Sequence, residues 1–229
     1  MHVNNETGVI QPLTEICESV IDHPAFLHVD AAQGFGKQID VLQNPRIDLI
    51  SISGHKVYGP KGIGALVMRY RGFDRPPLTP LLFGGGQERG LRPGTLPVLL
   101  IVGLGLAAEL ASKEFRQRAK VCQKYKEKVI RALSPLQPII NGDPSRTLPH
   151  VLNLSFPGLD SEAVMLALKD IIAISNGSAC TSQSYQPSHV LKAMGLSDRR
   201  IQGAVRLSWS HMTDGPNWNH VVESIQKLQ

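Results

Sequence analysis

The sequence predicts an α/β protein, in which a mostly parallel sheet with helices precedes a small α+β domain. Short apolar runs alternate with helical patterns along the first part of the chain, and polar side chains gather where these runs end. Beyond Val151 the pattern changes to short strands and helices in close alternation. We therefore expect a larger domain over residues 1–111 and a smaller one over residues 112–229.

The first elements follow in the order helix, strand, strand, strand. Apolar residues at helical spacing after Pro12 predict a helix that ends near Ile21, because proline suits a first helical turn. Strands are expected over residues 26–30, 48–53 and 64–69. In an open α/β sheet the ligand binds beyond the carboxyl ends of the strands, so the residues that follow these runs are the first candidates for a site.

The middle of the chain predicts a loop and two helices. Residues 84–95 are rich in glycine, carry two arginines and lead directly into an apolar helix expected over residues 96–110. A helix N-terminus with such side chains suits an anion. A long amphipathic helix over residues 112–133 then connects to the second domain.

The second domain begins after a polar, turn-rich stretch at residues 135–149. Its expected elements are a strand over 151–156, a helix over 161–168, a strand over 171–175, a helix from 189, a strand over 204–208 and a helix over 218–228.

The bulk composition is that of a globular protein. Of the 229 residues, 42% are hydrophobic and 19% charged, and no apolar run approaches the length of a membrane span. The start lacks the pattern of a secretory signal, and three cysteines without metal-like spacing argue against a disulfide framework, so a cytoplasmic protein is expected. The net charge is +5, but the basic residues are not interleaved with the aromatic residues that would favour nucleic-acid binding.

Lys56 is the first candidate for chemistry. An apolar run that starts at Ile47 leads into Ser53, Gly54, His55 and Lys56, and a glycine-rich turn follows. A lysine at the end of a buried strand is costly to keep charged, so burial would lower the pKa of its amine and favour the neutral nucleophile. Neutral amines form Schiff bases with carbonyl compounds. The alternative is an ordinary surface lysine in a turn.

Three further residues are candidates, each with a plainer alternative. Asp30 ends an apolar strand, where it would keep the ring nitrogen of a cofactor protonated or simply cap a turn. Cys180 lies in a polar, small-residue stretch that predicts an exposed nucleophilic thiol, whereas Cys17 and Cys122 lie on helical patterns and are expected to be structural. Arg206 follows an apolar pair in a predicted strand and is either a carboxylate ligand or a surface arginine.

Six blocks of the chain carry a family resemblance. They span residues 2–8, 28–33, 53–62, 84–90, 92–95 and 175–182, in the same order as in the family. On these blocks the chain resembles the cysteine desulfurases of the NifS/IscS type, which are class V, fold-type I pyridoxal-phosphate enzymes. The resemblance implies a fold-type I large domain, pyridoxal 5'-phosphate as cofactor, and conversion of L-cysteine to L-alanine with transfer of the sulfur to an enzyme cysteine.

The resemblance also implies roles for the cofactor-binding residues. Lys56 matches the lysine that binds the cofactor covalently and moves the substrate's α-proton. Asp30 matches the partner of the pyridine nitrogen, and Gln33 matches the donor to the phenolic oxygen. Ser53 and His55 match ligands of the phosphate.

The remaining roles concern the substrate and the second subunit. Asn5 matches an asparagine near the phenolic oxygen and the substrate carboxylate, and Arg206 matches the arginine that binds that carboxylate. Cys180 matches the nucleophile that accepts the sulfur as a persulfide. Thr95 matches a threonine that reaches the phosphate of the other subunit's cofactor, which implies a homodimer.

The family has a further N-terminal segment that completes its large sheet, whereas here the first matching block begins at His2, directly after Met1. We therefore expect an N-terminally truncated desulfurase with impaired turnover. A catalytically silent fragment that binds a partner through its small domain is the alternative from another class. A metal or iron–sulfur protein is a weaker one, because Cys180 alone supplies one ligand at most, to a transient cluster on a partner.

The sulfur acceptor is left open by the residues. Relatives of this type supply iron–sulfur cluster assembly, tRNA thiolation and DNA phosphorothioation, each through an acceptor protein. The stretch over residues 176–189 resembles the phosphorothioation branch weakly.

Overall fold

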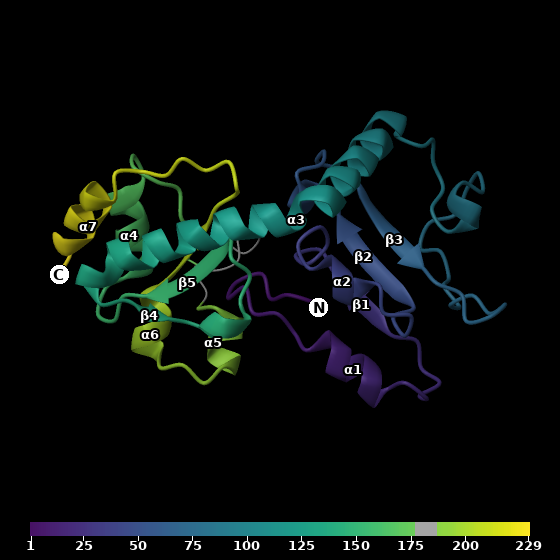
Figure 1. Cartoon of the computed structure of the whole chain (residues 1–229), viewed down its shortest axis with the longest axis horizontal. Helices are drawn as coiled ribbons and strands as arrows, with labels where there is room; N and C mark the ends of the chain where they lie inside the picture. The colour runs from purple at the N-terminus through teal and green to yellow at the C-terminus, as the bar shows by residue number, and fades with distance from the viewer. Residues whose placement is uncertain (177–186) are drawn as a thin grey trace. The chain divides into compact units, whose positions relative to one another are not determined.

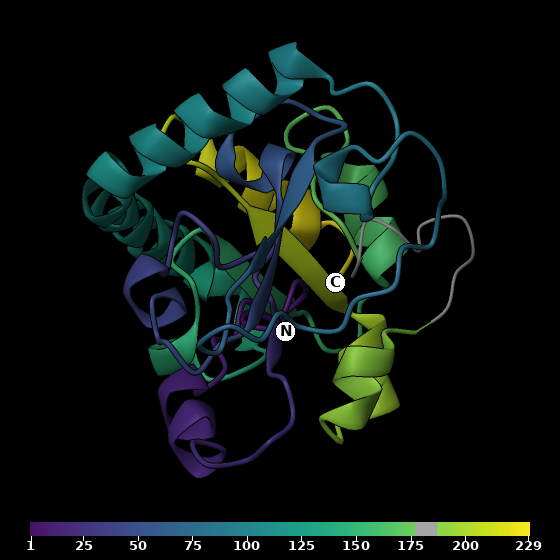
Figure 2. The same ribbon diagram turned by 90° about the vertical axis from the view of Figure 1, so that its right-hand side faces the viewer.

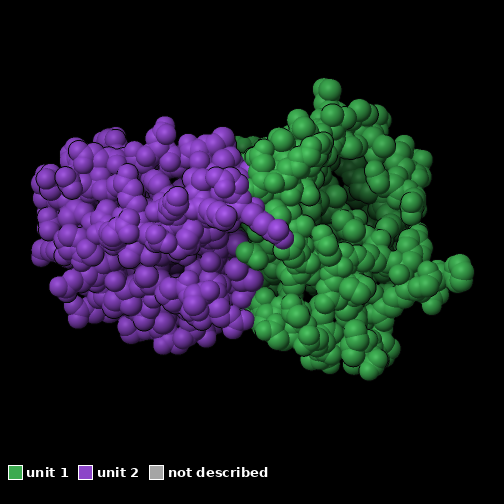
Figure 3. Space-filling view, viewed as in Figure 1, with its two compact units in different colours: residues 1–3, 11–115 green, residues 4–10, 116–229 purple. Residues whose placement is uncertain are grey.

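The computed structural model describes residues 1–176 and 187–229 of the chain. It divides into two compact units, coloured separately in Figure 3. Unit 1 comprises Met1–Val3 and Gln11–Phe115, and unit 2 comprises Asn4–Ile10 and Arg116–Gln229. The sequence predicted a boundary between residues 111 and 112. It did not predict that Asn4–Ile10 belongs to unit 2.

Unit 1 contains a three-stranded sheet in the order β1-β2-β3, in which β1 and β2 are parallel and β3 is antiparallel to β2. Its elements are α1 (Leu13–Ser19), β1 (His28–Asp30), α2 (Ile39–Leu42), β2 (Leu49–Ser53), the 3₁₀ turn η1 (Gly54–Val57), β3 (Gly64–Met68), the 3₁₀ turn η2 (Glu88–Gly90) and the first part of α3 (Val98–Leu133). Figure 1 shows β1 and β2 side by side, with their carboxyl ends at one edge.

Two clusters of apolar side chains hold unit 1 together. Leu13 and Cys17 of α1 pack with Val29 of β1 and Ile50 of β2. In the second cluster, Val57 packs with Leu104, Ala107 and Ala111, which recur along one face of α3. This second cluster fixes the turn after β2 against the long helix.

Unit 2 is built on an antiparallel sheet in the order β4-β5-β6. Its elements are the second part of α3, η3 (Ser134–Leu136), β4 (Ile139–Ile140), η4 (Pro144–Arg146), β5 (Val151–Ser155), α4 (Ser161–Leu168), α5 (His189–Ala193), α6 (Asp198–Gln202), β6 (Ala204–Ser208) and α7 (Trp218–Gln226). The core combines buried side chains of β5 and β6 with apolar faces of α3, α4 and α7. Asp160, Ser188 and Asn217 accept backbone N–H groups as N-caps of α4, α5 and α7.

The helical region from residue 96 to residue 133 differs from the sequence prediction. Two helices were expected, but α3 is one helix of 36 residues, seen as a single ribbon in Figures 1 and 2. No proline interrupts Val98–Leu133, and Ala107 and Ala111 continue the helical face across the predicted break. Packing explains the glycine at position 103, because a Cβ there would lie 2.5 Å from the Cγ atom of Pro60.

One predicted strand is wrong. Of residues 171–175, all of which the structure describes, only Ser175 pairs, in an isolated bridge with Arg206 of β6. The preceding amides of Ile171 and Ile172 instead donate to the carbonyl of Leu168, which turns the chain at the end of α4. The short elements α2, β4 and α6 were not predicted, because elements of two to five residues carry too little periodicity.

Candidate active-site residues

The predicted cofactor residues of unit 1 lie at the carboxyl edge of two neighbouring strands. Asp30 ends β1 and pairs with Ser51 of β2, and Ser53 ends β2 two residues later. The parallel register therefore brings the residues that follow β1 and β2 to the same edge of the sheet. His55 and Lys56 follow directly in η1.

The backbone around Asp30 is held on both sides. Its carbonyl accepts the N–H of His2 at 2.7 Å, and the next residue, Ala31, donates to the carbonyl of Ser51 at 2.9 Å. The Asp30 side chain is exposed, and its Oδ1 accepts the N–H of Ala32 at 2.9 Å. Asp30 thus caps the turn after β1 through one oxygen, which was the plainer alternative, and its side chain remains exposed.

Ser53 and His55 contact each other. The Ser53 hydroxyl and the His55 Nδ1 atom are 3.1 Å apart, so a hydroxyl and an imidazole stand together at the end of β2. Lys56 follows with an exposed side chain. The sequence argument expected a buried lysine, but Lys56 is exposed, whereas its neighbours Gly54 and Val57 in η1 are buried.

Lys37 is a residue that the sequence analysis missed. Its ammonium donates to the carbonyl of Lys56 at 2.9 Å and to the carbonyl of Gln33 at 3.2 Å. One cation thereby ties the turn after β1 to the turn after β2. No local pattern marks Lys37, since its two acceptors are backbone atoms that come together only in the folded unit.

His2 is buried beside the same edge. Its side chain has no exposed surface, and within the described part of the chain neither ring nitrogen has a hydrogen-bond partner. Burial, with a smaller effect of the N-terminal ammonium, lowers the pKa of His2 to about 4, so the ring is neutral at physiological pH. Gly34 makes room for it, because a Cβ at that position would lie 2.1 Å from the His2 Nδ1 atom.

Thr95 lies in the segment between η2 and α3 and is exposed. The preceding loop is shaped by Gln87, whose side-chain oxygen accepts the N–H of Gly94 at 3.0 Å. Gly94 itself has a φ of +111°, a conformation that favours glycine. Thr95 thus follows a defined turn rather than a helical or strand segment.

Unit 2 brings together Asn5 and Arg206. The Arg206 Nη1 atom donates to the carbonyl of Asn5 at 2.9 Å. Arg206 lies in β6 opposite Asn153 of β5, so the sheet fixes the backbone position from which the Arg206 side chain extends. Asn5 and Arg206 belong to unit 2, whereas Asp30 and Lys56 belong to unit 1.

Cys180 lies outside the described residues. The other two cysteines, Cys17 and Cys122, are both buried, as expected for structural cysteines. Burial raises the pKa of Cys17, which disfavours its thiolate.

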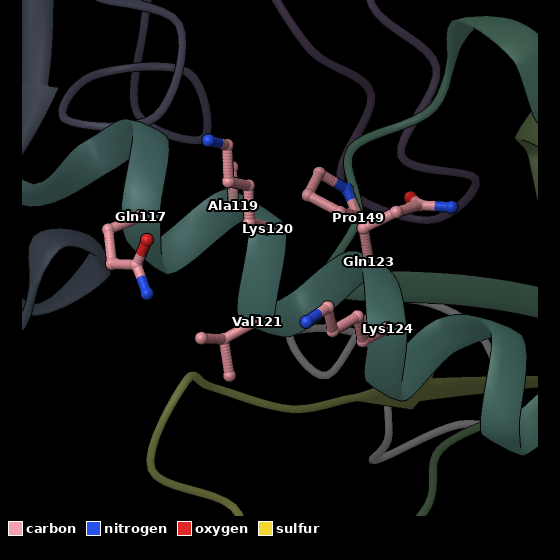
Figure 4. Close-up of a pocket in the computed structure, with 7 residues that line it drawn as sticks. All are labelled: Gln117, Ala119, Lys120, Val121, Gln123, Lys124 and Pro149. Carbon is pink, nitrogen blue, oxygen red and sulfur yellow. The ribbon is translucent and has the colours of Figure 1, made fainter.

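A hollow of about 520 Å³ lies elsewhere, on the surface of α3 in unit 2. Figure 4 shows its lining, in which Lys120 and Lys124 stand beside Val121 and Pro149. None of the predicted site residues that the structure describes lines it. In the described ranges 1–176 and 187–229, no group of three His, Cys, Asp or Glu side chains is arranged to hold a metal ion, and no helix is both long and apolar enough to cross a bilayer.

The comparisons with known proteins decide the family. The Aminotransferase class-V family matches residues 1–215. The chain belongs to the class-V aminotransferase family. Among curated class-V relatives, the cysteine desulfurase IscS of Rickettsia bellii is 45% identical over 227 residues, which cover 98% of this chain and 55% of that protein.

Solved class-V structures have the same fold. DndA from Streptomyces lividans is 47% identical, with a TM-score of 0.79 over 92% of this chain and 59% of that one. SspA, solved in complex with cysteine, is 39% identical, with a TM-score of 0.69 over 90% of this chain and 56% of that one. The predicted fold-type I α/β class is confirmed. The chain spans about half the length of the curated relatives it matches.

Class-V enzymes of this type use pyridoxal phosphate, so the predicted cofactor is confirmed for the family. The edge residues of unit 1 fit this group chemically. Lys56 offers an exposed amine, Asp30 an exposed carboxylate, and Ser53 with His55 a hydroxyl and an imidazole 3.1 Å apart. These are the functional groups that an aldehyde, a pyridine nitrogen and a phosphate each require.

Proposed function

We propose that this chain carries the catalytic residues of a pyridoxal-phosphate-dependent cysteine desulfurase. The observation that supports this most directly is the carboxyl edge of β1 and β2, where Asp30, Ser53, His55 and Lys56 gather. A carboxylate, a primary amine, a hydroxyl and an imidazole on adjacent strand ends suit the ring nitrogen, the aldehyde and the phosphate of this cofactor.

The proposed cofactor residues contact different groups of the cofactor. Pyridoxal phosphate, when bound, supplies an aldehyde for amines and a ring that delocalises an electron pair from the substrate. Asp30 pairs with the ring nitrogen, Gln33 donates to the phenolic oxygen, and Ser53 and His55 bind the phosphate. Lys56 supplies the anchoring amine and moves the proton of the substrate's α-carbon.

Asn5, Arg206 and Cys180 act on the substrate in this proposal. Asn5 and the guanidinium of Arg206 orient the carboxylate of L-cysteine. The thiolate of Cys180 attacks the substrate sulfur, so that a sulfur–sulfur bond forms and the carbon–sulfur bond breaks. The carbon keeps the bonding electron pair and takes up a proton, which leaves L-alanine and a persulfide on Cys180. SspA, a relative solved with cysteine, supports L-cysteine as the substrate.

A homodimer and an acceptor protein complete the proposal. Exposed apolar side chains on the first turns of α3 and on the loop that precedes Thr95 support a second copy at this surface of unit 1. The persulfide has to leave Cys180 for an acceptor protein before the next turnover. A reducing cytoplasm suits a thiol that returns to its reduced form in each cycle.

Persulfide formation on Cys180 is the decisive measurement. The purified chain is mixed with pyridoxal phosphate and L-cysteine, alkylated, digested and analysed by mass spectrometry, while alanine is measured in parallel. We expect a persulfide on Cys180 and not on Cys17 or Cys122, because the latter two thiols are buried.

Two variants distinguish an active enzyme from a catalytically silent fragment. Cys180→Ala is expected to abolish alanine formation while cofactor absorbance is retained, and Lys56→Ala is expected to lose both. If the wild-type chain binds the cofactor but forms neither persulfide nor alanine, the partner-binding alternative is favoured. Alanine formation that is equal in Cys180→Ala and wild type would contradict the role of the thiol.

A further inference from the structure

The turn that follows β1 packs directly against the 3₁₀ turn η1 in unit 1. Gly36 has a φ of +73°, and a Cβ at that position would lie 2.3 Å from the Cγ2 atom of Val57. The Val57 side chain is buried in the apolar cluster that joins η1 to α3. The two turns therefore meet closely, just beyond the carboxyl ends of β1 and β2.

Lys37 adds a polar contact between the same two turns. Its ammonium donates to the carbonyl of Lys56 at 2.9 Å and to the carbonyl of Gln33, four residues before it, at 3.2 Å. Lys37 is half-buried. The last carbonyls of a helical turn lack partners within that turn, and a lysine ammonium is a favourable donor to them. Lys37 thus caps η1 from a separate segment of the chain.

The backbone that carries Lys37 is bonded to itself and to the sheet. The N–H groups of Lys37 and Gln38 donate to the carbonyl of Gly34 at 3.0 and 2.8 Å. Ala31, at the start of this turn, donates to the carbonyl of Ser51 in β2 at 2.9 Å. The ammonium therefore extends from a backbone that is fixed relative to β1 and β2.

The carbonyl that Lys37 holds belongs to the turn that carries the proposed anchoring amine. Because the Lys56 side chain is exposed and has a flexible stem, the position of its backbone sets the space that the amine can reach. His55 precedes it and lies 3.1 Å from the Ser53 hydroxyl. A shift of η1 would therefore move the amine and the imidazole relative to Gln33 and the rest of the turn after β1.

We propose that Lys37 is a positioning residue for Lys56, because its ammonium holds the Lys56 backbone against the turn after β1. This inference rests on the proposed desulfurase function for its effect on cofactor binding. Lys56 and Gln33 are proposed to contact the aldehyde and the phenolic oxygen, which are neighbouring groups of one ring. A tie between their two backbones suits such a ligand, since groups that are already in place lose less entropy on binding.

Three variants isolate the ammonium of Lys37. Lys37→Met removes the charge and the donors but keeps an unbranched side chain. Lys37→Arg keeps the charge and supplies several N–H donors, so it can bond to both carbonyls. Lys113→Met is the matched control, because Lys113 is an exposed lysine of the same unit whose ammonium pairs with the Glu109 side chain instead of the backbone of a turn.

Hydrogen exchange of the chain without cofactor measures the tie itself. In Lys37→Met we expect the amides of residues 54–59 to exchange about tenfold faster than in the wild type, because η1 loses its cap. The amides of residues 49–53 in β2 should exchange as before, which distinguishes a local release of η1 from a general loss of stability. Lys37→Arg and Lys113→Met should both match the wild type.

Cofactor binding measures the consequence for Lys56. The aldehyde of pyridoxal phosphate condenses with an amine and releases one water, whereas pyridoxamine phosphate has the same ring and phosphate but no aldehyde. In absorbance titrations of Lys37→Met, we expect the dissociation constant of pyridoxal phosphate to rise about tenfold, and that of pyridoxamine phosphate to rise less than about threefold. Lys37→Arg should bind both compounds as the wild type does, and so should Lys113→Met.

The outcomes separate the tie, the positioning role and the proposed function. Equal exchange over residues 54–59 in Lys37→Met and wild type would overturn the tie. Faster exchange that extends to residues 49–53, an unchanged affinity for pyridoxal phosphate, or an equal loss of affinity for both compounds would overturn the positioning role. A wild-type chain that binds neither compound would overturn the proposed function and the positioning role together, and the exchange comparison would still decide the tie.

Discussion

At the scale of single residues, close packing constrains the backbone at the sheet edge that carries the candidate residues. Gly34 follows β1 at a position where any side chain meets His2, whose ring is fully buried and neutral. The His2 ring has little room to retreat, because its own N–H and carbonyl are bonded to Asp30 and Gln11. The glycine therefore preserves the backbone that presents Asp30.

Gly34→Ala should lower the free energy of unfolding by about 2 kcal/mol, because the new Cβ would overlap the His2 ring. Gly105→Ala is the matched control, since Gly105 is an exposed position of α3 with no atom within 4 Å of the added Cβ. It should raise the same quantity by roughly 0.5–1 kcal/mol through helix propensity. Urea unfolding followed by circular dichroism measures both, and a neutral Gly34→Ala would contradict the clash.

At the scale of elements, an ion-pair cluster joins the starts of β1 and β2 to the chain after β3. Asp48 is 2% exposed and accepts Arg46 at 2.9 Å, Arg71 at 2.6 Å and the N–H of Leu27 at 2.6 Å. Burial alone would raise the pKa of Asp48, but the hydrogen bonds from Arg71 and Leu27 and the charges of both arginines lower it. The cluster orients the sheet whose opposite edge carries the candidate site.

This cluster should make unit 1 sensitive to acid. A carboxyl whose pKa is lowered on folding contributes stability above its unfolded pKa of about 3.9 and loses it as the pH falls through the folded value. Asp48→Asn should therefore cost about 3 kcal/mol at neutral pH, and less at about pH 3. Urea unfolding at the two pH values measures the difference.

Glu109→Gln is the control for this acid-to-amide change. Glu109 pairs with Lys113 on the exposed surface of α3, where an ion pair contributes little to stability. No measurable change is expected for it at either pH. A cost of Asp48→Asn that is the same at both pH values would show that lost packing, rather than lost charge, explains the effect.

At the scale of the whole molecule, unit 1 has an apolar surface that a lone chain would leave in water. Leu99 is 87% exposed, and Val98, Val102 and Leu106 lie near it on successive turns of α3. Leu81 and Phe83 are 95% and 83% exposed on the preceding loop. Surfaces of this kind in soluble proteins mark interaction sites.

The proposed homodimer should depend on this surface. Leu99→Glu combined with Val102→Glu is expected to convert a dimer to a monomer in analytical ultracentrifugation, because two buried charges would lack partners. Val121→Glu, an exposed apolar position further along the same helix, should leave the dimer intact. A wild-type chain that sediments as a monomer at micromolar concentration would contradict the homodimer.

Local patterns located most elements and made Asp30, Lys56, Cys180 and Arg206 candidates, whereas the roles of the other predicted site residues came from the family resemblance. The apolar run before Ser53, the strand that ends at Asp30 and the glycine-rich turn after Lys56 each lie within a few neighbouring residues. Helical spacing likewise located α1, α4 and α7 to within a few residues of their ends. Spacing along the chain carries this information because secondary structure repeats over short distances.

Tertiary structure decided the rest, because contacts between distant segments leave no local pattern. The exposure of Lys56, the two carbonyls that meet at Lys37 and the room that Gly34 leaves for His2 appear only when separate turns come together. The same is true of the hydrogen bond from Ser188 to Glu6, which joins the turn after residue 4 to the cap of α5. Short stretches of residues indicate the candidate chemistry, whereas the backbone that carries these residues is held by hydrogen bonds and packing between distant segments.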